Sequence, residues 1–177
     1  EILAEYGAGA FAETTVSDAA GFDAERHERH VDGDISESQT HQAGVLRTVT
    51  ERLRQREVGA IAYALRDTDS AGLGVYGVDG TEKAARETLR RAFAPVQAFL
   101  AAPGARESTV VIVNDLPQTL SPTLSWTAGE KSGERECTVE AHSQYETDPI
   151  SIPADTDQVE LVVSVGSETV ENVYDLS

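Results

Sequence analysis

The spacing of the apolar residues changes near residue 104, and this change limits the folds open to the chain. Within residues 45–53 the apolar side chains recur at helical spacing, whereas within 159–165 they recur at every second position. The first pattern predicts an amphipathic helix and the second a half-buried strand. We therefore expect an α+β fold in which the helices precede most of the strands along the chain.

After residue 104, short apolar and β-branched clusters are separated by Gly, Pro, Asn and Asp residues. Such spacing is typical of a C-terminal antiparallel β-sandwich or jelly-roll-like module. The continuous run at 109–113 further indicates a strand that is buried on both faces. The expected strands are Thr109–Val113, Leu124–Thr127, Cys137–Ala141, Ile150–Ile152 and Val159–Val165.

The first helix of the middle segment carries its apolar stripe at residues 45–53, with arginines falling largely away from it. The pattern can continue as far as Leu65, but Gly59 weakens a helix there. A strand over Val58–Leu65 is the alternative. We expect a loop or hairpin over Asp67–Gly80.

A second helix is expected from Thr81, because Asp79 and Glu82 have the spacing of a capping box. Its apolar stripe extends over residues 85–100. Pro95 lies inside that stripe and should kink the helix or divide it in two.

The first forty residues show no persistent period, and we expect an N-terminal extended arm with a short strand near Glu13–Val16. The sequence thus divides into an acidic arm (1–40), a helical segment (41–104) and a β-sandwich segment (105–177). The second and third segments are expected to form one compact domain.

The chain is strongly acidic, with 31 Asp and Glu against 14 Lys and Arg and a formal net charge of -17. The net charge is -8 over residues 1–40, +2 over 41–104 and -11 over 105–177. Such a surface repels nucleic acid and anionic membranes. Salt would screen the self-repulsion. The composition resembles that of haloarchaeal proteins, so we expect a high-salt environment and no direct contact with nucleic acid.

Other features of the composition exclude some chemistry. Cys137 is the single cysteine, so the chain can form neither an internal disulfide nor a cysteine cluster for a metal. No apolar stretch has the roughly 18 residues of a membrane span. The chain contains no Met, so Glu1 is expected to follow processing or trimming.

Weak metal candidates occur between residues 27 and 38, where histidines are followed by alternating oxygen-bearing side chains. The two histidines stand three residues apart rather than four, and the acidic series has no Gly at the sixth position of a calcium loop. We therefore predict a polar surface stretch and no bound metal. The candidates are His27, His30, Asp32, Asp34, Ser36 and Ser38.

Gly72, Gly74 and Gly77 match a dinucleotide-binding pattern formally. That pattern must follow a strand directly and open a helix, whereas here Asp67–Ser70 precede it and the next helix starts later. We predict no cofactor. A glycine-rich hairpin, or a loop that packs closely on a neighbouring chain, is the preferred interpretation.

Arginines are concentrated in the middle segment, which is the only one of the three without a net negative charge. Because guanidinium groups bind carboxylates with two hydrogen bonds, we expect this set to contact acidic segments of the same chain or of another subunit. The predicted interface residues are Arg47, Arg52, Arg54, Arg56, Arg86, Arg90 and Arg91.

These patterns favour a non-enzymatic structural or assembly subunit of a halophilic virion or cell-surface structure. It would be extracellular or virion-borne and would self-associate, or join other structural subunits, through its arm and helical segment. One alternative is a secreted β-sandwich module that binds glycan, lipid or protein, for which exposed Trp126 and Tyr145 would be the mark. A second alternative is a small hydrolase that uses a metal held by the candidates above.

Overall fold

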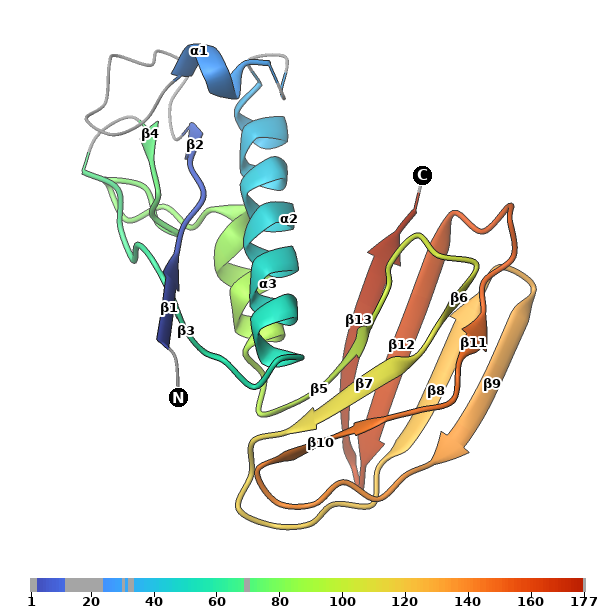
Figure 1. The fold of residues 1–177 in the computed structure, drawn as a ribbon. Coiled ribbons are helices and arrows are strands. Elements are labelled where there is room, and N and C mark those ends of the chain that lie inside the picture. Colours follow the sequence, from blue (N-terminus) through green and yellow to red (C-terminus); the bar gives the residue numbers. More distant parts are fainter. Residues whose placement is uncertain (1–2, 12–23, 30, 32–33, 69–70, 177) are drawn as a thin grey trace. The chain divides into compact units, whose positions relative to one another are not determined.

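The computed structural model divides the chain into two compact units, which we call unit 1 (Glu1–Ala92) and unit 2 (Phe93–Ser177) (Figure 1). It describes residues 3–11, 24–29, 31, 34–68 and 71–176. The described helices lie in unit 1, and the described strands of unit 2 pair in antiparallel sheets. The fold is therefore mixed, with helices and many antiparallel strands, in agreement with the α+β class expected from the sequence. No described helix is both long and apolar enough to span a membrane.

Unit 1 combines a parallel pair of strands with two packed helices. Its elements are β1 (Leu3–Tyr6), β2 (Ala10–Phe11), α1 (Ala24–His27), α2 (Ile35–Arg54), β3 (Gly59–Ala62), β4 (Ala71–Gly72) and α3 (Ala84–Ala92). Strands β1 and β3 are parallel, and α2 lies between them in the chain, as a parallel crossover requires (Figure 1). Strands β2 and β4 form a short antiparallel pair.

The first strands of the chain pair with later parts of unit 1, and α1 and the start of α2 also lie within the range predicted as an extended arm. Strand β1 aligns Tyr6 with Ala62 of β3, and Phe11 of β2 is only 2% exposed. These residues therefore belong to the packed interior of unit 1. The strand expected near Glu13–Val16 lies outside the described residues.

Helix α2 begins earlier than its apolar pattern indicates, because Asp34 caps it. The Asp34 carboxylate accepts hydrogen bonds from the backbone nitrogens of Ser36 (2.5 Å) and Glu37 (3.2 Å), which satisfies donors that the first turn leaves free. The helix ends at Arg54. Residues 59–62 form β3, so the alternative of a strand over Val58–Leu65 was the better prediction there.

The buried face of α2 differs from the predicted one. Val45, Val49 and Leu53 are only half-buried, whereas the fully buried stripe follows every fourth residue and is mainly polar. Polar side chains can be buried there because they bond backbone or side-chain groups of neighbouring segments. The stripe consists of Ser38, Gln42, Leu46, Thr50 and Arg54.

The predicted second helix is wrong beyond Ala92. Helix α3 begins at Ala84 rather than Thr81, and Val96–Leu100 is strand β5 of unit 2. Pro95 explains the break, since it lacks an amide hydrogen and disfavours helical backbone in the residue before it. All five residues of β5 are buried, and a strand buried on both faces shows no alternation to distinguish it from a buried helix.

Unit 2 contains a three-stranded sheet in the order β10-β7-β5 and a four-stranded sheet in the order β13-β12-β8-β9, with β11-β6 as a separate pair. Its strands are β5 (Val96–Leu100), β6 (Glu107–Ser108), β7 (Val110–Asn114), β8 (Thr123–Ala128), β9 (Lys131–Glu136), β10 (Ser143–Glu146), β11 (Ile150–Ser151), β12 (Gln158–Val165) and β13 (Glu168–Asp175).

One hydrophobic core in unit 2 draws on both of these sheets. Ala98 and Ile112 come from the three-stranded sheet, while Leu124 and Leu161 come from the four-stranded one, and all four are fully buried. The predicted strand over Cys137–Ala141 is wrong: β9 ends at Glu136. The buried Cys137 and Val139 follow it, and Val139 makes only an isolated bridge.

Candidate functional site at the carboxyl ends of β1 and β3

Glu5 lies near the carboxyl end of β1, on the face of the parallel pair that α2 does not cover. The Tyr6 hydroxyl hydrogen-bonds the Thr50 side chain of α2. Because successive side chains of a strand point to opposite faces, Glu5 points away from α2. Glu5 is exposed, and its partner Ile61 on β3 is 47% exposed. An ionisable group is thus presented at the strand ends where α/β folds place their active sites.

Aromatic and apolar side chains continue from this face into the segment after β3. Tyr63 is 53% and Leu65 73% exposed. The backbone nitrogen of Tyr63 donates to the carbonyl oxygen of Tyr6 at 2.7 Å, which extends the pairing by one residue, and the peptide bond between Tyr63 and Ala64 is cis. A carboxylate beside exposed apolar and aromatic groups is a suitable surface for an organic ligand that has polar and apolar faces.

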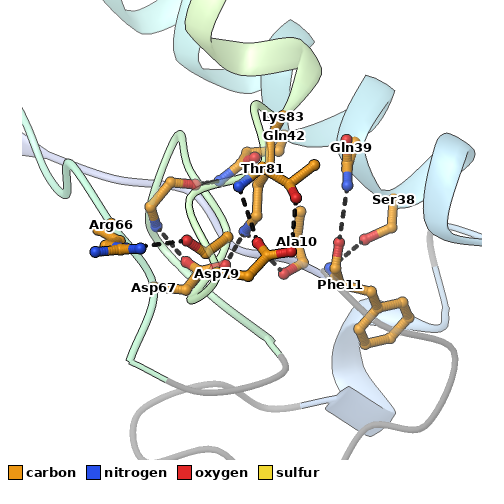
Figure 2. A network of polar contacts seen from close by, with 12 residues as sticks. Ala10, Phe11, Ser38, Gln39, Gln42, Arg66, Asp67, Asp79, Thr81 and Lys83 are labelled. Carbon is orange, nitrogen blue, oxygen red and sulfur yellow. Dashed lines mark hydrogen bonds and ion pairs between the residues drawn. The ribbon is translucent and has the colours of Figure 1, made fainter.

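Beneath these strand ends, three polar side chains are buried together. Gln42 of α2 is 0%, Asp67 5% and Lys83 3% exposed. The Lys83 ammonium forms an ion pair with the Asp67 carboxylate, and the other oxygen of that carboxylate accepts a hydrogen bond from the backbone nitrogen of Gly74 at 2.7 Å. Figure 2 shows this group between β2, α2 and the loop after β3. We call Gln42, Asp67 and Lys83 the polar centre.

The polar centre connects the backbone segments that follow β1 and β3. The Gln42 side-chain amide donates to the carbonyl oxygens of Ala8 (2.8 Å) and Gly74 (3.0 Å). The Lys83 ammonium also donates to the carbonyl oxygen of Ala10 at 3.4 Å. Ala8 and Ala10 follow β1, whereas Gly74 follows β3. The relative position of the two segments is therefore fixed by side-chain donors from the two helical regions.

Burial lowers the pKa of Lys83, and the hydrogen bond and charge of Asp67 act in the opposite direction. The cause is that an ammonium group loses hydration when it leaves water, whereas a carboxylate at contact distance stabilises the charged form. The pair is enclosed almost completely, because the Lys83 and Asp67 side chains are 1% and 0% exposed. The Lys83–Asp67 pair therefore acts on the packing within unit 1 and does not contact solvent.

The glycines that resemble a dinucleotide-binding loop permit close packing around Asp67. A Cβ atom at Gly72 or Gly74 would lie 2.7 Å from an Asp67 carboxylate oxygen, and one at Gly7 would lie 2.5 Å from the Tyr63 carbonyl oxygen. These approaches leave no room for a side chain. The close packing expected for this loop is present within the chain itself.

The described metal candidates occupy packed or helix-capping positions. The His27 ring is 9% exposed, its Nε2 atom lies 2.7 Å from the Ser38 hydroxyl, and it packs edge-on against Phe11 and His41. His27 and Ser38 therefore belong to a packed interior.

Asp34 and Ser36 lie together at the first turn of α2, where the Asp34 carboxylate caps the helix. His30 and Asp32 lie outside the described residues. Within residues 3–11, 24–29, 31, 34–68 and 71–176, no three His, Cys, Asp or Glu side chains form a group that could hold a metal ion.

Five of the seven predicted interface arginines make side-chain contacts within unit 1. Arg90 and Arg91 both bond the Glu87 carboxylate, at 2.7 and 2.9 Å, and these bonds lower the pKa of Glu87 to about 2. The remaining contacts join Arg47 to Glu51, Arg86 to Glu82 and Arg54 to the carbonyl oxygen of Ala92. Arg52 and Arg56 are exposed. Their contribution to an interface with another subunit stays a prediction.

Neither aromatic residue proposed as a ligand platform in unit 2 is freely exposed. Trp126 and Tyr145 are half-buried and pack against the core of unit 2. Trp126 also lies over Gly133, and the Arg135 guanidinium is 5.8 Å from its ring centroid. The half-burial of both residues weakens the alternative of a glycan, lipid or protein module that binds through them.

Sequence reasoning missed both Glu5 and the polar centre. Glu5 is one of 31 acidic residues and carries no distinguishing motif. Two signals for the polar centre were available: Lys83 is one of only two lysines in the chain, and Gln42 stands four residues after Ser38 and four before Leu46. A polar residue on the buried period of a helix indicates an internal hydrogen-bonded position.

The fold resembles parts of larger solved enzymes. Over 99% of this chain, it matches a β-D-mannosidase from Dictyoglomus thermophilum with a TM-score of 0.75 and 13% sequence identity. Over 83% of this chain, it matches an exo-chitosanase from Amycolatopsis orientalis with a TM-score of 0.59 and 17% identity. At these identities the likeness concerns the fold alone. No family model and no curated protein matches the chain.

The chain spans 27% of the mannosidase and 19% of the exo-chitosanase. Two further structures of that exo-chitosanase are complexes with PNP-β-D-glucosamine, each of a variant in which a single Asp or Glu is replaced with Ala. The similarity therefore concerns a segment of those proteins.

Proposed function

We propose that this chain forms part of a glycoside hydrolase that acts on β-linked mannose or glucosamine residues, and that Glu5 is one of its two catalytic carboxylates. One observation carries the proposal: almost the whole chain follows the fold of a β-D-mannosidase with a TM-score of 0.75. The exo-chitosanase likeness supports the same class of reaction.

The position of Glu5 supports this role. Most glycosidases use a pair of Asp or Glu residues that flank the scissile bond. Glu5 carries an exposed carboxylate near the carboxyl end of the parallel strand β1. It is aligned with Ile61 of β3, and Tyr63 directly follows β3. The second carboxylate of the pair would come from a part of the protein that the neighbouring enzymes possess and this chain does not span.

The parallel pair β1–β3 fits a larger sheet. Parallel sheets are normally covered on both faces, yet Glu5, Ile61 and Tyr63 are exposed on the face away from α2. We infer that further parallel strands from the same protein continue this pair.

For unit 2, we infer a β-sandwich, because its three- and four-stranded sheets enclose one core.

The test is hydrolysis of PNP-β-D-mannoside and PNP-β-D-glucosaminide by the complete gene product in about 1 M KCl, which screens the acidic surface. Glu5→Gln should lower kcat by about 10²–10⁴-fold. Glu134→Gln in β9 is the matched control and should leave kcat unchanged. Absence of hydrolysis of both substrates, or full activity of Glu5→Gln, would contradict the proposal.

Self-association as a structural subunit is a second proposal, and the exposed apolar groups of unit 1 favour it. Ile61, Tyr63 and Leu65 are 47%, 53% and 73% exposed, and apolar patches of this kind mark contact surfaces. Light scattering in molar salt tests it. A strict monomer at all concentrations would exclude an assembly role, whereas oligomers that dissociate in Leu65→Asp would support it.

A further inference from the structure

We propose that Lys83 and Gln42 are positioning residues of the proposed glycosidase site, because they tie the backbone that follows β1 to the backbone that follows β3. This inference rests on the proposed function, since it assumes that Glu5 reacts with the substrate. It assigns a task in catalysis to side chains that are themselves buried and remote from solvent.

The first set of hydrogen bonds holds the backbone segment that follows Glu5. Three residues after Glu5, the carbonyl oxygen of Ala8 accepts a hydrogen bond from the Gln42 amide at 2.8 Å. The carbonyl oxygen of Ala10 then accepts one from the Lys83 ammonium at 3.4 Å. The backbone just beyond the proposed carboxylate is therefore anchored at two points to side chains from α2 and from the residue before α3.

The second set of contacts holds the backbone segment that follows Tyr63. The same Gln42 amide donates to the carbonyl oxygen of Gly74 at 3.0 Å, and the same Lys83 ammonium pairs with Asp67. Asp67 also accepts a hydrogen bond from the Gly74 nitrogen at 2.7 Å. Each of the two donor side chains thus contacts both segments at once (Figure 2).

The packing around these contacts leaves little freedom to shift. A Cβ atom at Gly7 would lie 2.5 Å from the Tyr63 carbonyl oxygen, and one at Gly72 would lie 2.7 Å from Asp67. The Gly7 contact brings the two segments together at a distance that admits no side chain, and the Gly72 contact packs the second segment against Asp67. If one donor is lost, they should move apart as a unit rather than adjust locally, because densely packed interiors transmit displacement.

A buried ion pair is an inefficient way to gain stability alone. Desolvation of both charges offsets most of their attraction, and an apolar pair of similar volume is often as stable. An apolar pair could bond neither the carbonyl oxygen of Ala10 nor the backbone nitrogen of Gly74, however. We infer that Lys83 and Gln42 keep the backbone at the two strand ends in a fixed position. This matters for catalysis because a displacement of about 1 Å at a catalytic group can reduce turnover by about 10²-fold.

The experiment compares Lys83→Met, the double variant Asp67→Asn/Lys83→Met, and Gln42→Met in the complete gene product, with PNP-β-D-mannoside and PNP-β-D-glucosaminide as substrates. Lys83→Met leaves the Asp67 carboxylate buried without its cation and should be poorly folded. The double variant removes both charges and should regain most of the unfolding midpoint. It still lacks the donor to Ala10, so its kcat should remain about 10²-fold low while KM changes little.

Arg54→Met is the matched control. Arg54 is a second buried cation of unit 1, at the last residue of α2, and it bonds the carbonyl oxygen of Ala92 at the end of α3. It should lower the unfolding midpoint without lowering the kcat of the folded enzyme. Gln42→Met, which removes two donors and no charge, should lower kcat like the double variant, and it keeps the inference testable if the double variant does not fold.

The outcomes separate this inference from the proposed function. If Glu5→Gln is inactive but a folded double variant and Gln42→Met both turn over at the wild-type rate, the positioning role is excluded and the glycosidase proposal stands. If kcat recovers in step with the unfolding midpoint, the polar centre is purely structural and the inference fails. If Glu5→Gln is fully active, the proposed function itself fails.

Discussion

The phenol oxygen of Tyr174 lies 3.0 Å from the backbone nitrogen of Leu100 and accepts its hydrogen bond. Tyr174 belongs to β13 of the four-stranded sheet, and Leu100 ends β5 of the three-stranded sheet. The Asn172 side chain, also on β13, donates to the Ala98 carbonyl oxygen at 2.9 Å and to the Tyr174 hydroxyl at 3.1 Å. Two side chains of β13 therefore bond backbone groups of β5 and join the two sheets of unit 2.

We predict that Tyr174→Phe lowers the free energy of unfolding by about 1–3 kcal/mol, the cost of leaving a buried donor without that acceptor. Leu100 is 0% exposed, so water cannot replace the hydroxyl without a structural change. Urea unfolding followed by circular dichroism measures the effect. Tyr145→Phe, which removes a hydroxyl from a half-buried residue of β10, is the control; an equal loss in both variants would contradict the specific role of Tyr174.

A second prediction concerns Gly133, which lies against the ring of Trp126, the only tryptophan of the chain. A Cβ atom at position 133 would overlap the ring, so Gly133→Ala should push the indole toward solvent. We expect a shift of the fluorescence emission to longer wavelength and a loss of about 1–3 kcal/mol, as for overpacked sites. Gly104→Ala is a useful comparison for stability, since Gly104 has no neighbour within 4 Å but has a positive φ of 85°. Unchanged emission in Gly133→Ala would contradict the prediction.

The sequence predicted elements with one exposed and one buried face, and also the fully buried β7, whose β-branched run distinguishes it from a helix. Strand β12 was found because its apolar residues recur at a period of two, and α2 because its apolar residues recur at helical spacing. Strand β5 was assigned to a helix, since all its residues are buried and no alternation remains. The helix prediction for β5 failed for a physical reason: when every residue of a run is buried, its apolar residues show neither the helical nor the strand period.

The candidate site was less accessible to sequence reasoning than the fold. Asp67 and Lys83 stand sixteen positions apart in the sequence and meet only because the loop between them folds back. The backbone nitrogen of Lys83 bonds the Val75 carbonyl oxygen within that loop. Gln42 lies outside the apolar stripe predicted at residues 45–53, yet it is completely buried. Charged and amide side chains are usually exposed, so a pattern argument places them outside unless their tertiary partners are known.

Acid should reveal the role of Glu87 in α3. Its hydrogen bonds to Arg90 and Arg91 lower its pKa from 4.5 to about 2. The unfolded chain therefore binds a proton at higher pH than the folded one. The stability from these bonds is complete above about pH 4.5 and is lost as the pH falls toward about 2.

We accordingly expect Glu87→Gln to be less stable than the wild type at pH 7, and the difference to shrink between about pH 4.5 and 2. The effect should be small, because the group is exposed and screened. Urea midpoints across this range measure it, with Glu168→Gln of β13 as the control. A difference that stays constant with pH would exclude the two arginine bonds as its cause.

The net charge of -17 predicts that salt stabilises the fold. The excess is concentrated at -8 in residues 1–40 and -11 in residues 105–177, so the repulsion acts mainly between carboxylates that attractive pairs do not balance. Raising the ionic strength from about 0.1 M to 1 M shortens the screening length from about 10 Å to 3 Å, which removes most of this repulsion. The melting temperature should therefore rise with KCl, by about 2–4 °C for each kcal/mol gained.

Sucrose is the control for this experiment, because it favours the compact state by exclusion from the surface and does not screen charge. If repulsion dominates, KCl should raise the melting temperature steeply below about 1 M and little above it, since screening is then nearly complete. Sucrose should instead act in proportion to its concentration. A melting temperature that does not respond to KCl would contradict adaptation to a high-salt environment and would require the acidic side chains to be neutralised within the fold.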